Sequence, residues 1–474
     1  MGVTEVYSVE RANEFIAQTK GNINTQYRPK AHFVAPVGWI NDPNGFVYFR
    51  GEYHLFYQYF PYDSVWGPMH WGHAKSKDLV NWEHLPVALA PDKPYDISGC
   101  FSGSAIVKDD TLWLMYTGHI VREDGTVRQM QNMAYSKDGI HFEKLASNPV
   151  LDEKDLPDEI DPADFRDPKV FERDGKYYAV VAAKYRNNGG CIVLVGSDDL
   201  VDWQFESIFL KGNPEHGIMW ECPDYFNLDG EDCLVMSPMQ VARDGLKHHN
   251  INTTYFMRGT VDWQTKTFEP QTIEEVDSGH DFYAPQSLED DKGRRIIIAW
   301  MHTWGRRNVT KEFNHQWAMA MTIAREVRIQ DGKVIQTPVL PPLTTPVSLD
   351  EVVNQAIVVD VDNQQQASFE LHYGSDNDFI SIRYQESDNA VYINRQGLKE
   401  QLLGEEKIPV IERGVVVKEA TVESLRLVID THSIEVFVNQ GSSVLTSNYF
   451  FDSATQPRLQ VVSGEVELTG YALS

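Results

Sequence analysis

The chain has 474 residues, of which 42 are basic and 69 acidic, so its formal net charge is −27. A surface this acidic repels nucleic acids and anionic membranes, and we expect neither as a partner. The N-terminus lacks the apolar core of a secretory signal, and no apolar run approaches the ~18 residues that a membrane-spanning helix requires. Four cysteines in so long a chain match neither a disulfide framework nor a zinc-site spacing, which predicts a cytoplasmic protein that binds no metal.

The first segment, residues 1–29, differs in character from the rest of the chain. It contains the sequence VERANEFIAQTK, in which apolar and polar residues recur at helical spacing. We therefore expect an N-terminal extension that forms an amphipathic helix and folds against the body of the protein.

A short phrase recurs about every sixty residues in the next part of the chain. It reads SKDLVNW, SKDGIHF and SDDLVDW, ending at Trp82, Phe142 and Trp203, and a weaker fourth copy comes after these. Upstream of each copy, two apolar or aromatic runs flank a polar turn, which is the pattern of a β-hairpin. A third strand precedes each phrase and a fourth segment comes after it. Four antiparallel strands per unit, in five units, predict a five-bladed β-propeller over residues 30–337.

The fifth unit lacks the aromatic end of the phrase, and we expect its hairpin at residues 294–304 and 315–327. Four prolines between Pro338 and Pro346 would interrupt sheet ladders, so residues 338–348 predict a linker. Segments with period-two alternation and no helical stretch lie beyond this linker. The chain is thus predicted to be all-β, a five-bladed propeller followed by a β-sandwich over residues 349–474.

Each unit opens with a related sequence: NDPNGF, FSGSAI, RDPKVF, ECPDYF and YAPQSL. The innermost strands of a propeller line its central channel and share one orientation. Asp42 and Asp167 each stand directly before a proline, and Glu221 stands one residue earlier. We therefore expect these three carboxylates, from three blades, to meet at one end of the axis.

A cluster of carboxylates suits the cleavage of a glycosidic bond. Like charges in one pocket raise the pKa of at least one group, so one carboxylic acid keeps its proton while another is ionised. Such a pair can protonate the leaving oxygen and attack the anomeric carbon. Each motif alone is also compatible with an ordinary turn or a surface ion pair, and it is their equivalent position in three blades that favours a catalytic site.

The ordered motifs WINDPNG, FSGSA, FRDP and WECPD resemble those of glycoside hydrolase family 32, the invertases and bacterial sucrose-6-phosphate hydrolases. The resemblance covers nearly the whole chain. It implies that Asp42 is the nucleophile, that Glu221 is the general acid and then the base, and that Asp167 holds fructose hydroxyls and stabilises the transition state. Because the implied mechanism retains configuration, we expect the Asp42 and Glu221 carboxyl groups to lie roughly 5–6 Å apart.

The same resemblance implies a set of substrate-binding residues around the carboxylates. Arg166 would set the local field, and Tyr283 would support Glu221 or the pocket wall. The remaining expected substrate contacts are Asn41, Gln58, Trp66, Phe101, Ser102 and Trp304.

The expected function is hydrolysis of the terminal fructosyl bond of sucrose, sucrose 6-phosphate or short fructo-oligosaccharides, without a cofactor, by a monomer or homodimer. A phosphorylated sugar would need basic loop residues, and the candidates are Arg122, Lys247-His248-His249 and Arg306-Arg307, each of which also reads as ordinary solvated charge. Two alternatives stay open. One is a fructosyltransferase that uses the same covalent intermediate, and the other is a sugar-binding propeller without catalysis, which would lack at least one carboxylate.

Overall fold

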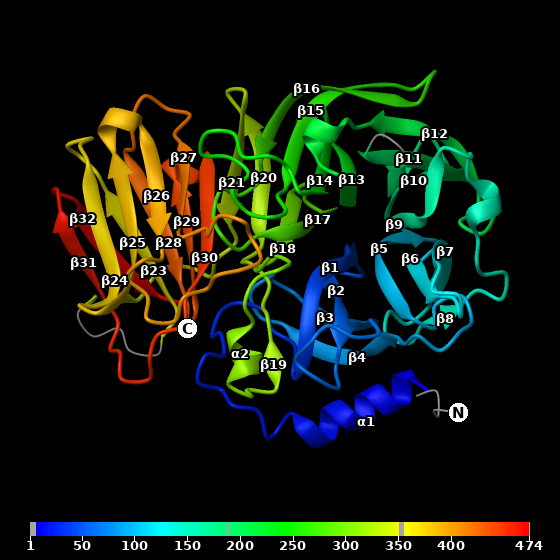
Figure 1. Ribbon diagram of the computed structural model, residues 1–474, viewed down its shortest axis with the longest axis horizontal. Coiled ribbons are helices and arrows are strands. Elements are labelled where there is room, and N and C mark those ends of the chain that lie inside the picture. Colours follow the sequence, from blue (N-terminus) through cyan, green and yellow to red (C-terminus); the bar gives the residue numbers. More distant parts are fainter. Residues whose placement is uncertain (1–5, 187–188, 350–354, 474) are drawn as a thin grey trace.

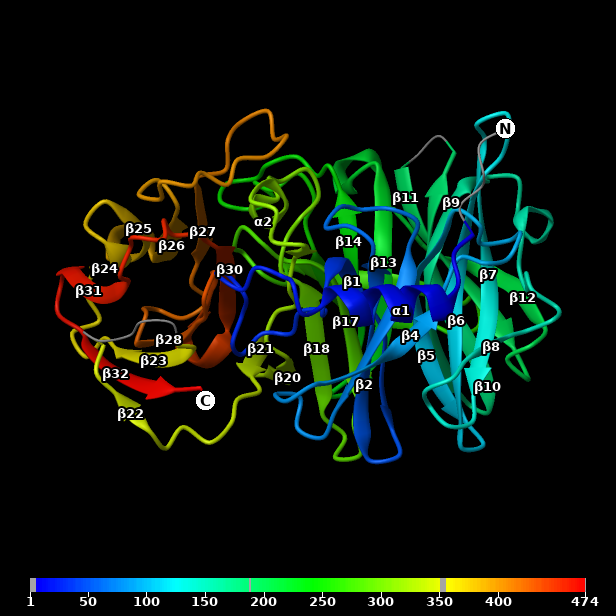
Figure 2. The ribbon, with the colours of Figure 1, turned by 90° about the horizontal axis from the view of Figure 1, so that it is seen from below.

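The computed structural model describes residues 6–186, 189–349 and 355–473. Two β-rich units lie side by side in both views, the first built from the N-terminal two thirds of the chain and the second from the rest (Figures 1 and 2). Helix α1 (Val9–Thr19) lies along the edge of the first unit and contacts β4 (Glu83–Leu89). Its N-cap is Ser8, whose side chain accepts a hydrogen bond from the Arg11 amide. Within the described residues, no helix is long and apolar enough to cross a membrane.

The first unit consists of five sheets, each with four strands that are ordered as in the sequence and pair antiparallel with their neighbours. The strands are β1 (Gly38–Phe49), β2 (Glu52–Phe60), β3 (His70–Ser76) and β4 (Glu83–Leu89); β5 (Gly99–Lys108), β6 (Thr111–Val121), β7 (Val127–Ser136) and β8 (Glu143–Lys144); β9 (Ile160–Arg173), β10 (Lys176–Tyr185), β11 (Gly189–Ser197) and β12 (Trp203–Lys211); β13 (Met219–Leu228), β14 (Glu231–Met239), β15 (Tyr255–Asp262) and β16 (Thr267–Glu275); and β17 (Tyr283–Glu289), β18 (Arg295–Trp300), β20 (Arg325–Gln330) and β21 (Lys333–Pro338). The first strands contact one another in the order β1, β5, β9, β13 and β17, and β17 contacts β1 in turn. The five-bladed propeller is confirmed.

The recurring phrase forms the same hydrogen-bonded turn between the third and fourth strands of three blades. In the first copy the Ser76 hydroxyl accepts from the Leu79 amide at 2.9 Å, and the Asp78 carboxylate accepts from the Asn81 amide at 2.7 Å. Equivalent bonds recur at Ser136 and Asp138 and at Ser197 and Asp199. Serine and aspartate therefore recur because their side chains satisfy the backbone amides of this turn.

The prediction for the fifth blade was wrong in one part. Residues 315–327 do not form a single strand of that blade, because β20 begins only at Arg325. Further upstream, β19 (Trp317–Ala318) pairs in parallel with β1 of the first blade. Gln316 and Met319 adopt left-handed backbone conformations, with φ of 66° and 75°, and these interrupt the ladder on both sides of β19. The segment thereby ties the end of the propeller to its beginning.

The second unit is a β-sandwich, as predicted. One sheet has the order β22 (Pro346–Val347), β32 (Glu467–Ala472), β23 (Ile357–Asp362), β28 (Ser424–Ile429), β29 (Ser433–Val438) and β30 (Ser443–Asn448). The other has the order β27 (Glu412–Val416), β26 (Ala390–Asn394), β25 (Asp378–Gln385), β24 (Phe369–Ser375) and β31 (Arg458–Ser463). Alternate residues of both sheets are buried in one shared core. The expected linker is shorter than 338–348, because β22 already pairs with β32.

The short helical segments lie between strands. They are α2 (Val309–Glu312) and four 3₁₀ turns at Glu153–Asp155, Pro214–His216, Glu386–Asp388 and Asn439–Gly441.

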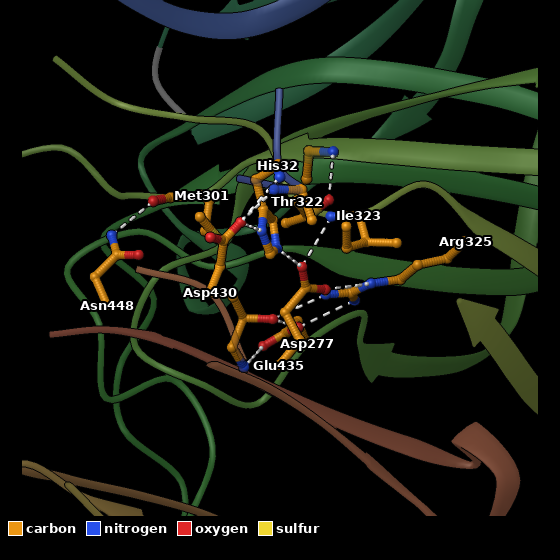
Figure 3. Close-up of polar contacts among 12 residues, drawn as sticks. His32, Asp277, Met301, Thr322, Ile323, Arg325, Asp430, Glu435 and Asn448 are labelled. Atoms are coloured by element: carbon orange, nitrogen blue, oxygen red, sulfur yellow. Dashed lines mark hydrogen bonds and ion pairs between the residues drawn. The ribbon is translucent and has the colours of Figure 1, made fainter. Parts of the chain in front are cut away.

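Buried charged side chains join the two units (Figure 3). The His32 ring contacts Asp430 and Glu435, both at 2.8 Å, and the Arg325 guanidinium contacts Glu435 at 2.6 Å and Asp277 at 3.1 Å. These five side chains have no exposed surface. Burial alone would lower the pKa of His32, but the two carboxylates bonded to it raise this pKa to about 9. The histidine is therefore a cation at neutral pH, clamped between two anions of the sandwich.

Candidate active site

The first strand of every blade carries a β-bulge at the same level. The residues that lack a cross-strand partner are Asn41 and Asp42, Ser102, Asp167 and Pro168, Cys222 and Pro223, and Ala284 and Pro285. Proline cannot donate to a ladder and is tolerated at such a bulge, which explains Pro168, Pro223 and Pro285. Pro43 directly follows the bulge of the first blade and lies opposite Tyr57. A bulge also redirects side chains. Asp167, Cys222 and Ala284 take left-handed φ values of 65°, 50° and 54°, uncommon for residues other than glycine.

The bulges align two tiers of side chains, with one residue from each blade in each tier. The first tier, directly before the proline or its equivalent, consists of Asp42, Ser102, Asp167, Cys222 and Ala284. The second tier, one residue earlier, consists of Asn41, Phe101, Arg166, Glu221 and Tyr283. Hydrogen bonds within these two tiers connect Asp42 to Asp167 through Cys222, and hold Glu221 between Arg166 and Tyr283.

Asp42 is held by donors from three blades. Its Oδ2 accepts from the Ser102 hydroxyl at 2.7 Å and lies 3.3 Å from Cys222 Sγ, while its Oδ1 accepts from the Asn41 amide at 3.1 Å. Burial, followed by the nearby charge of Glu221, raises the pKa of Asp42, and the three hydrogen bonds lower it. Burial and charge prevail, so the net shift is upward. The donors nevertheless fix both oxygens of the carboxylate in place.

Asp167 is linked to Asp42 through Cys222. The Cys222 amide donates to Asp167 Oδ2 at 2.9 Å, and its thiol sulfur lies 3.5 Å from the same oxygen. Burial and the charges of the other two carboxylates raise the pKa of Asp167, and Arg166 lowers it. The net result is a pKa of about 7. A cysteine without a disulfide usually behaves as a small buried apolar residue, but here Cys222 is a bridge between two carboxylates.

Glu221 is fixed from two sides. The Arg166 guanidinium donates to its Oε1 from Nε at 3.2 Å and from Nη2 at 3.0 Å, and the Tyr283 hydroxyl donates to its Oε2 at 2.6 Å. Burial and the charge of Glu221 raise the pKa of Tyr283 well above its usual value, so the phenol keeps its proton and remains a donor. Glu221 is partly exposed, whereas Asp42 and Asp167 are buried. Of the three carboxylates it is therefore the most accessible to solvent.

The carboxylates open into a cavity of about 530 Å³, within the usual range of small-molecule sites. Ten of the eleven side chains expected at the site line it, and Tyr283 lies behind Glu221. The lining residues are Asn41, Asp42, Gln58, Trp66, Phe101, Ser102, His119, Val127, Gln129, Ala163, Asp164, Arg166, Asp167, Glu221 and Trp304. Three carboxylates that can hold and transfer a proton, set in a cavity of this size, provide the groups needed for acid-base and nucleophilic cleavage of a sugar.

Comparison with known proteins identifies the family. The model of the glycosyl hydrolases family 32 N-terminal domain matches residues 32–338, and that of the family 32 C terminal matches residues 326–472. The chain belongs to glycosyl hydrolase family 32. Its relatives in this family include the raffinose invertase of Escherichia coli, 37% identical over 97% of each chain. They also include the sucrose-6-phosphate hydrolase of Zymomonas mobilis, 35% identical over 93% of this chain and 91% of the relative.

Solved family 32 structures have the same fold along the whole chain. The β-fructofuranosidase of Bombyx mori in complex with sucrose superposes with a TM-score of 0.86 and 33% identity, covering 98% of this chain and 97% of the other. The sucrose-6-phosphate hydrolase of Lactobacillus gasseri also gives a TM-score of 0.86, with 26% identity, covering 99% of this chain and 99% of the other.

Sequence analysis missed five residues that line the cavity of this family 32 protein: His119, Val127, Gln129, Ala163 and Asp164. The His119 ring stacks on Phe101 at 4.1 Å, and Arg166 donates to Asp164 at 2.7 Å and to Gln129 at 3.2 Å. None of the five lies in one of the four motifs. The available signal concerns Gln129 alone, a polar residue at a buried position of β7, where an amphipathic strand should be apolar. His119 on β6 and Asp164 on β9 are only partly buried.

The basic residues considered for a phosphate do not line the cavity. Arg306 is buried against Asp281 and Glu406, and Arg307 binds Glu312 and Glu400. Arg122 pairs with Glu153 at 3.1 Å, and Lys247 lines a separate cavity between the two units. In the described part of the chain, Arg166 is the only arginine or lysine that lines the catalytic cavity. In the same part, no group of three or more histidine, cysteine or acidic side chains is arranged to hold a metal ion.

Proposed function

We propose that this protein is a retaining β-fructofuranosidase that hydrolyses the terminal fructosyl bond of sucrose and related sugars. The observation that carries the proposal is the meeting of Asp42, Asp167 and Glu221 in one cavity, held by the bulges of three blades. Membership of family 32, a relative named raffinose invertase and a related structure that contains sucrose support the substrate class.

In the first step, Asp42 attacks the anomeric carbon of the fructosyl unit while Glu221 donates a proton to the glycosidic oxygen. The bond to the leaving sugar breaks as the ester bond to Asp42 forms. Fixed donors on Asp42 orient its attacking oxygen, and the accessibility of Glu221 suits a group that exchanges protons with the leaving sugar. The carboxylates lie close enough to affect one another's charge, so the proton that is transferred is shared among them before substrate binds. The raised pKa values of Asp42 and Asp167 indicate that these carboxylates hold protons more tightly than a free carboxylate does.

In the second step, Glu221 takes a proton from water, and the resulting hydroxide attacks the anomeric carbon. The ester to Asp42 breaks, fructose leaves, and two inversions give net retention. Asp167 is proposed to bind fructose hydroxyls beneath the reacting carbon and to stabilise the positive charge of the transition state. Arg166 and Tyr283 keep Glu221 in one orientation through both steps.

The stereochemistry of the product tests this mechanism. Proton NMR during the first minutes of sucrose hydrolysis should show β-fructofuranose before mutarotation. A first-formed α-anomer would rule out the covalent intermediate. Product analysis at high sucrose separates the hydrolase from a fructosyltransferase, because transfer to sugar would give trisaccharides in place of free fructose.

The charge of the cavity favours neutral sugars. Four carboxylates line it, the fourth being Asp164, and Arg166 is already bonded to Glu221 and Asp164. A phosphate in this cavity would meet repulsion with no free cation to offset it. We therefore expect kcat/KM to be higher for sucrose and raffinose than for sucrose 6-phosphate, and the opposite order would contradict this part of the proposal.

The cellular location and assembly are also proposed. Four free cysteines, three of them buried, are compatible with a reducing cytoplasm. A monomer or homodimer is expected, which light scattering after size-exclusion chromatography would test.

A further inference from the structure

Two tryptophans stand at the mouth of the catalytic cavity on segments outside the blade sheets. Trp66 lies in the loop between β2 and β3, is 46% exposed, and meets Phe101 edge-on at 6.1 Å. Trp304 is half-buried and stacks on Trp39 at 6.1 Å. Exposed indole faces at a cavity mouth are suited to binding sugar rings, so their placement affects substrate affinity.

The segment that begins at Trp304, residues 304–312, pairs with a loop of the sandwich, residues 400–406. The Glu405 amide donates to the Gly305 carbonyl at 2.7 Å, and the Arg307 amide donates to the Leu403 carbonyl at 3.2 Å. Arg306 forms an isolated antiparallel bridge with Gly404. A short backbone ladder therefore joins the sandwich to the residues directly after Trp304.

Two arginines strengthen this junction. Arg306, whose side chain is 1% exposed, binds Glu406 of the sandwich loop at 2.6 Å. Arg307 binds Glu400 of the same loop at 2.7 Å and also binds Glu312 of α2 at 2.7 Å. Arg307 therefore connects the sandwich loop to α2, which lies between the sandwich and the first blade in both views (Figures 1 and 2).

The same short helix holds the loop that carries Trp66. Asn308, its N-cap, donates to the Ser64 carbonyl at 2.9 Å, and Lys311 binds Asp63 at 2.6 Å. Continuous polar contacts thus run from residues 400–406 of the sandwich, through residues 304–312, to Asp63 and Ser64, which lie in the same loop just before Trp66.

We propose that residues 400–406 of the sandwich are a positioning element for the active site, acting through Arg307, α2 and Lys311 on Trp304 and Trp66. The sandwich then contributes to substrate binding as well as to stability. The proposal rests on the hydrolase function, because one of its readouts is the KM for sucrose. It assigns to Arg307 a mechanical role in place of the phosphate contact considered from the sequence.

The test uses the full chain with Arg307→Met and with Lys311→Glu. The tryptophans are expected to bind the substrate equally well in the ground state and in the transition state. Weakening this binding raises KM and leaves kcat nearly unchanged. We expect KM for sucrose to rise about tenfold in Arg307→Met, which loses several charge-assisted contacts, and about threefold in Lys311→Glu, which loses one exposed pair. The double variant Lys311→Glu with Asp63→Lys reverses the pair and should restore the parent KM. Arg50→Glu is the matched control, because Arg50 pairs with Asp110 on the surface at the far end of β1 from Asp42.

Amide hydrogen exchange gives a readout that needs no activity. Exchange in residues 62–68 should be faster in Arg307→Met than in the parent, and unchanged in Arg50→Glu. Equal exchange in this segment would overturn the proposal, as would a KM that stays at the parent value or that the charge reversal fails to restore. A parent that does not hydrolyse sucrose would instead contradict the proposed function, and the exchange result would still decide the positioning role.

Discussion

The catalytic cavity and the interface between the two units are both buried and charged, but they differ in how their carboxylates are paired with cations. In the cavity, four carboxylates accompany one guanidinium, that of Arg166, which bonds Glu221 and Asp164, and the pKa values of Asp42 and Asp167 are raised. At the interface, each of the three carboxylates labelled in Figure 3 contacts His32 or Arg325. The cavity therefore holds two carboxylates, Asp42 and Asp167, that no cation among the described residues bonds, whereas every one of the three interface carboxylates contacts a cation.

This difference predicts different consequences for mutation. Removing one partner of a buried ion pair leaves an uncompensated charge and destabilises the fold strongly. Removing one of several like charges relieves repulsion, so the fold loses little while the chemistry is lost. Variants in the two regions test this contrast, beginning with the largest expected effect.

The largest effect is expected for Asp42→Asn. This change keeps the shape of the side chain but removes the nucleophile, so we expect kcat to fall on the order of 10⁴-fold. Because one of three clustered carboxylates becomes neutral, the melting temperature should stay level or rise. Sucrose hydrolysis and thermal unfolding of the same preparation measure both quantities. A variant that keeps a tenth of the parent kcat, or that melts well below the parent, would contradict the expectation that cavity variants lose chemistry and keep stability.

The opposite pattern is expected for Arg325→Met at the interface. This change leaves Asp277 buried without its cation and leaves Glu435 with His32 alone, which should lower the free energy of unfolding by about 3–5 kcal/mol. The kcat of the remaining folded enzyme should match the parent, because Arg325 does not line the cavity. The matched control is Arg426→Met, which removes a half-exposed pair with Asp360 and should lower the free energy of unfolding by no more than about 1 kcal/mol. Equal losses in the two variants would mean that burial of the pair does not matter.

The third prediction concerns pH and His32. The pKa of this histidine is about 9 in the folded protein and about 6.5 in the unfolded chain. Since the folded value is raised, the stabilisation is fully present below pH 6.5 and is lost as the pH rises to about 9. The contribution is on the order of 3 kcal/mol. Denaturant unfolding between pH 6 and 10 should show this loss in the parent, and His32→Gln should remove most of the pH dependence. Parallel curves for the two proteins would show that His32 is neutral.

Sequence reasoning placed the three candidate carboxylates together because propeller symmetry links distant motifs. The recurring opening sequences place Asp42, Asp167 and Glu221 at equivalent positions in three blades, and channel-lining strands bring such positions together. The period-two pattern and the hairpin turns were local and repeated, so the two β-rich units could also be predicted from the sequence.

Contacts between segments without a repeat could not be predicted in this way. The pairing of β19 with β1 depends on two left-handed residues that no motif marks. Arg306 and Arg307 look like solvated loop charges until the sandwich loop is placed against them. Cys222 resembles an apolar residue in the sequence, because its role depends on a bulge that points its amide and thiol at carboxylates of two other blades.

The smallest expected effect concerns Cys222. The hydrogen bond from its thiol lowers the pKa of Asp42, so Cys222→Ala should raise that pKa. The nucleophile must be ionised, and the acid limb of the kcat/KM profile should therefore move to higher pH, by roughly a few tenths of a unit for so weak a donor. Cys222→Ser keeps a donor of similar size and should leave the limb in place or move it to lower pH. Both variants keep the amide that bonds Asp167, so a difference between them isolates the thiol. If serine and alanine shift the limb equally, the thiol does not tune Asp42, and the bridge between the two carboxylates rests on the amide alone.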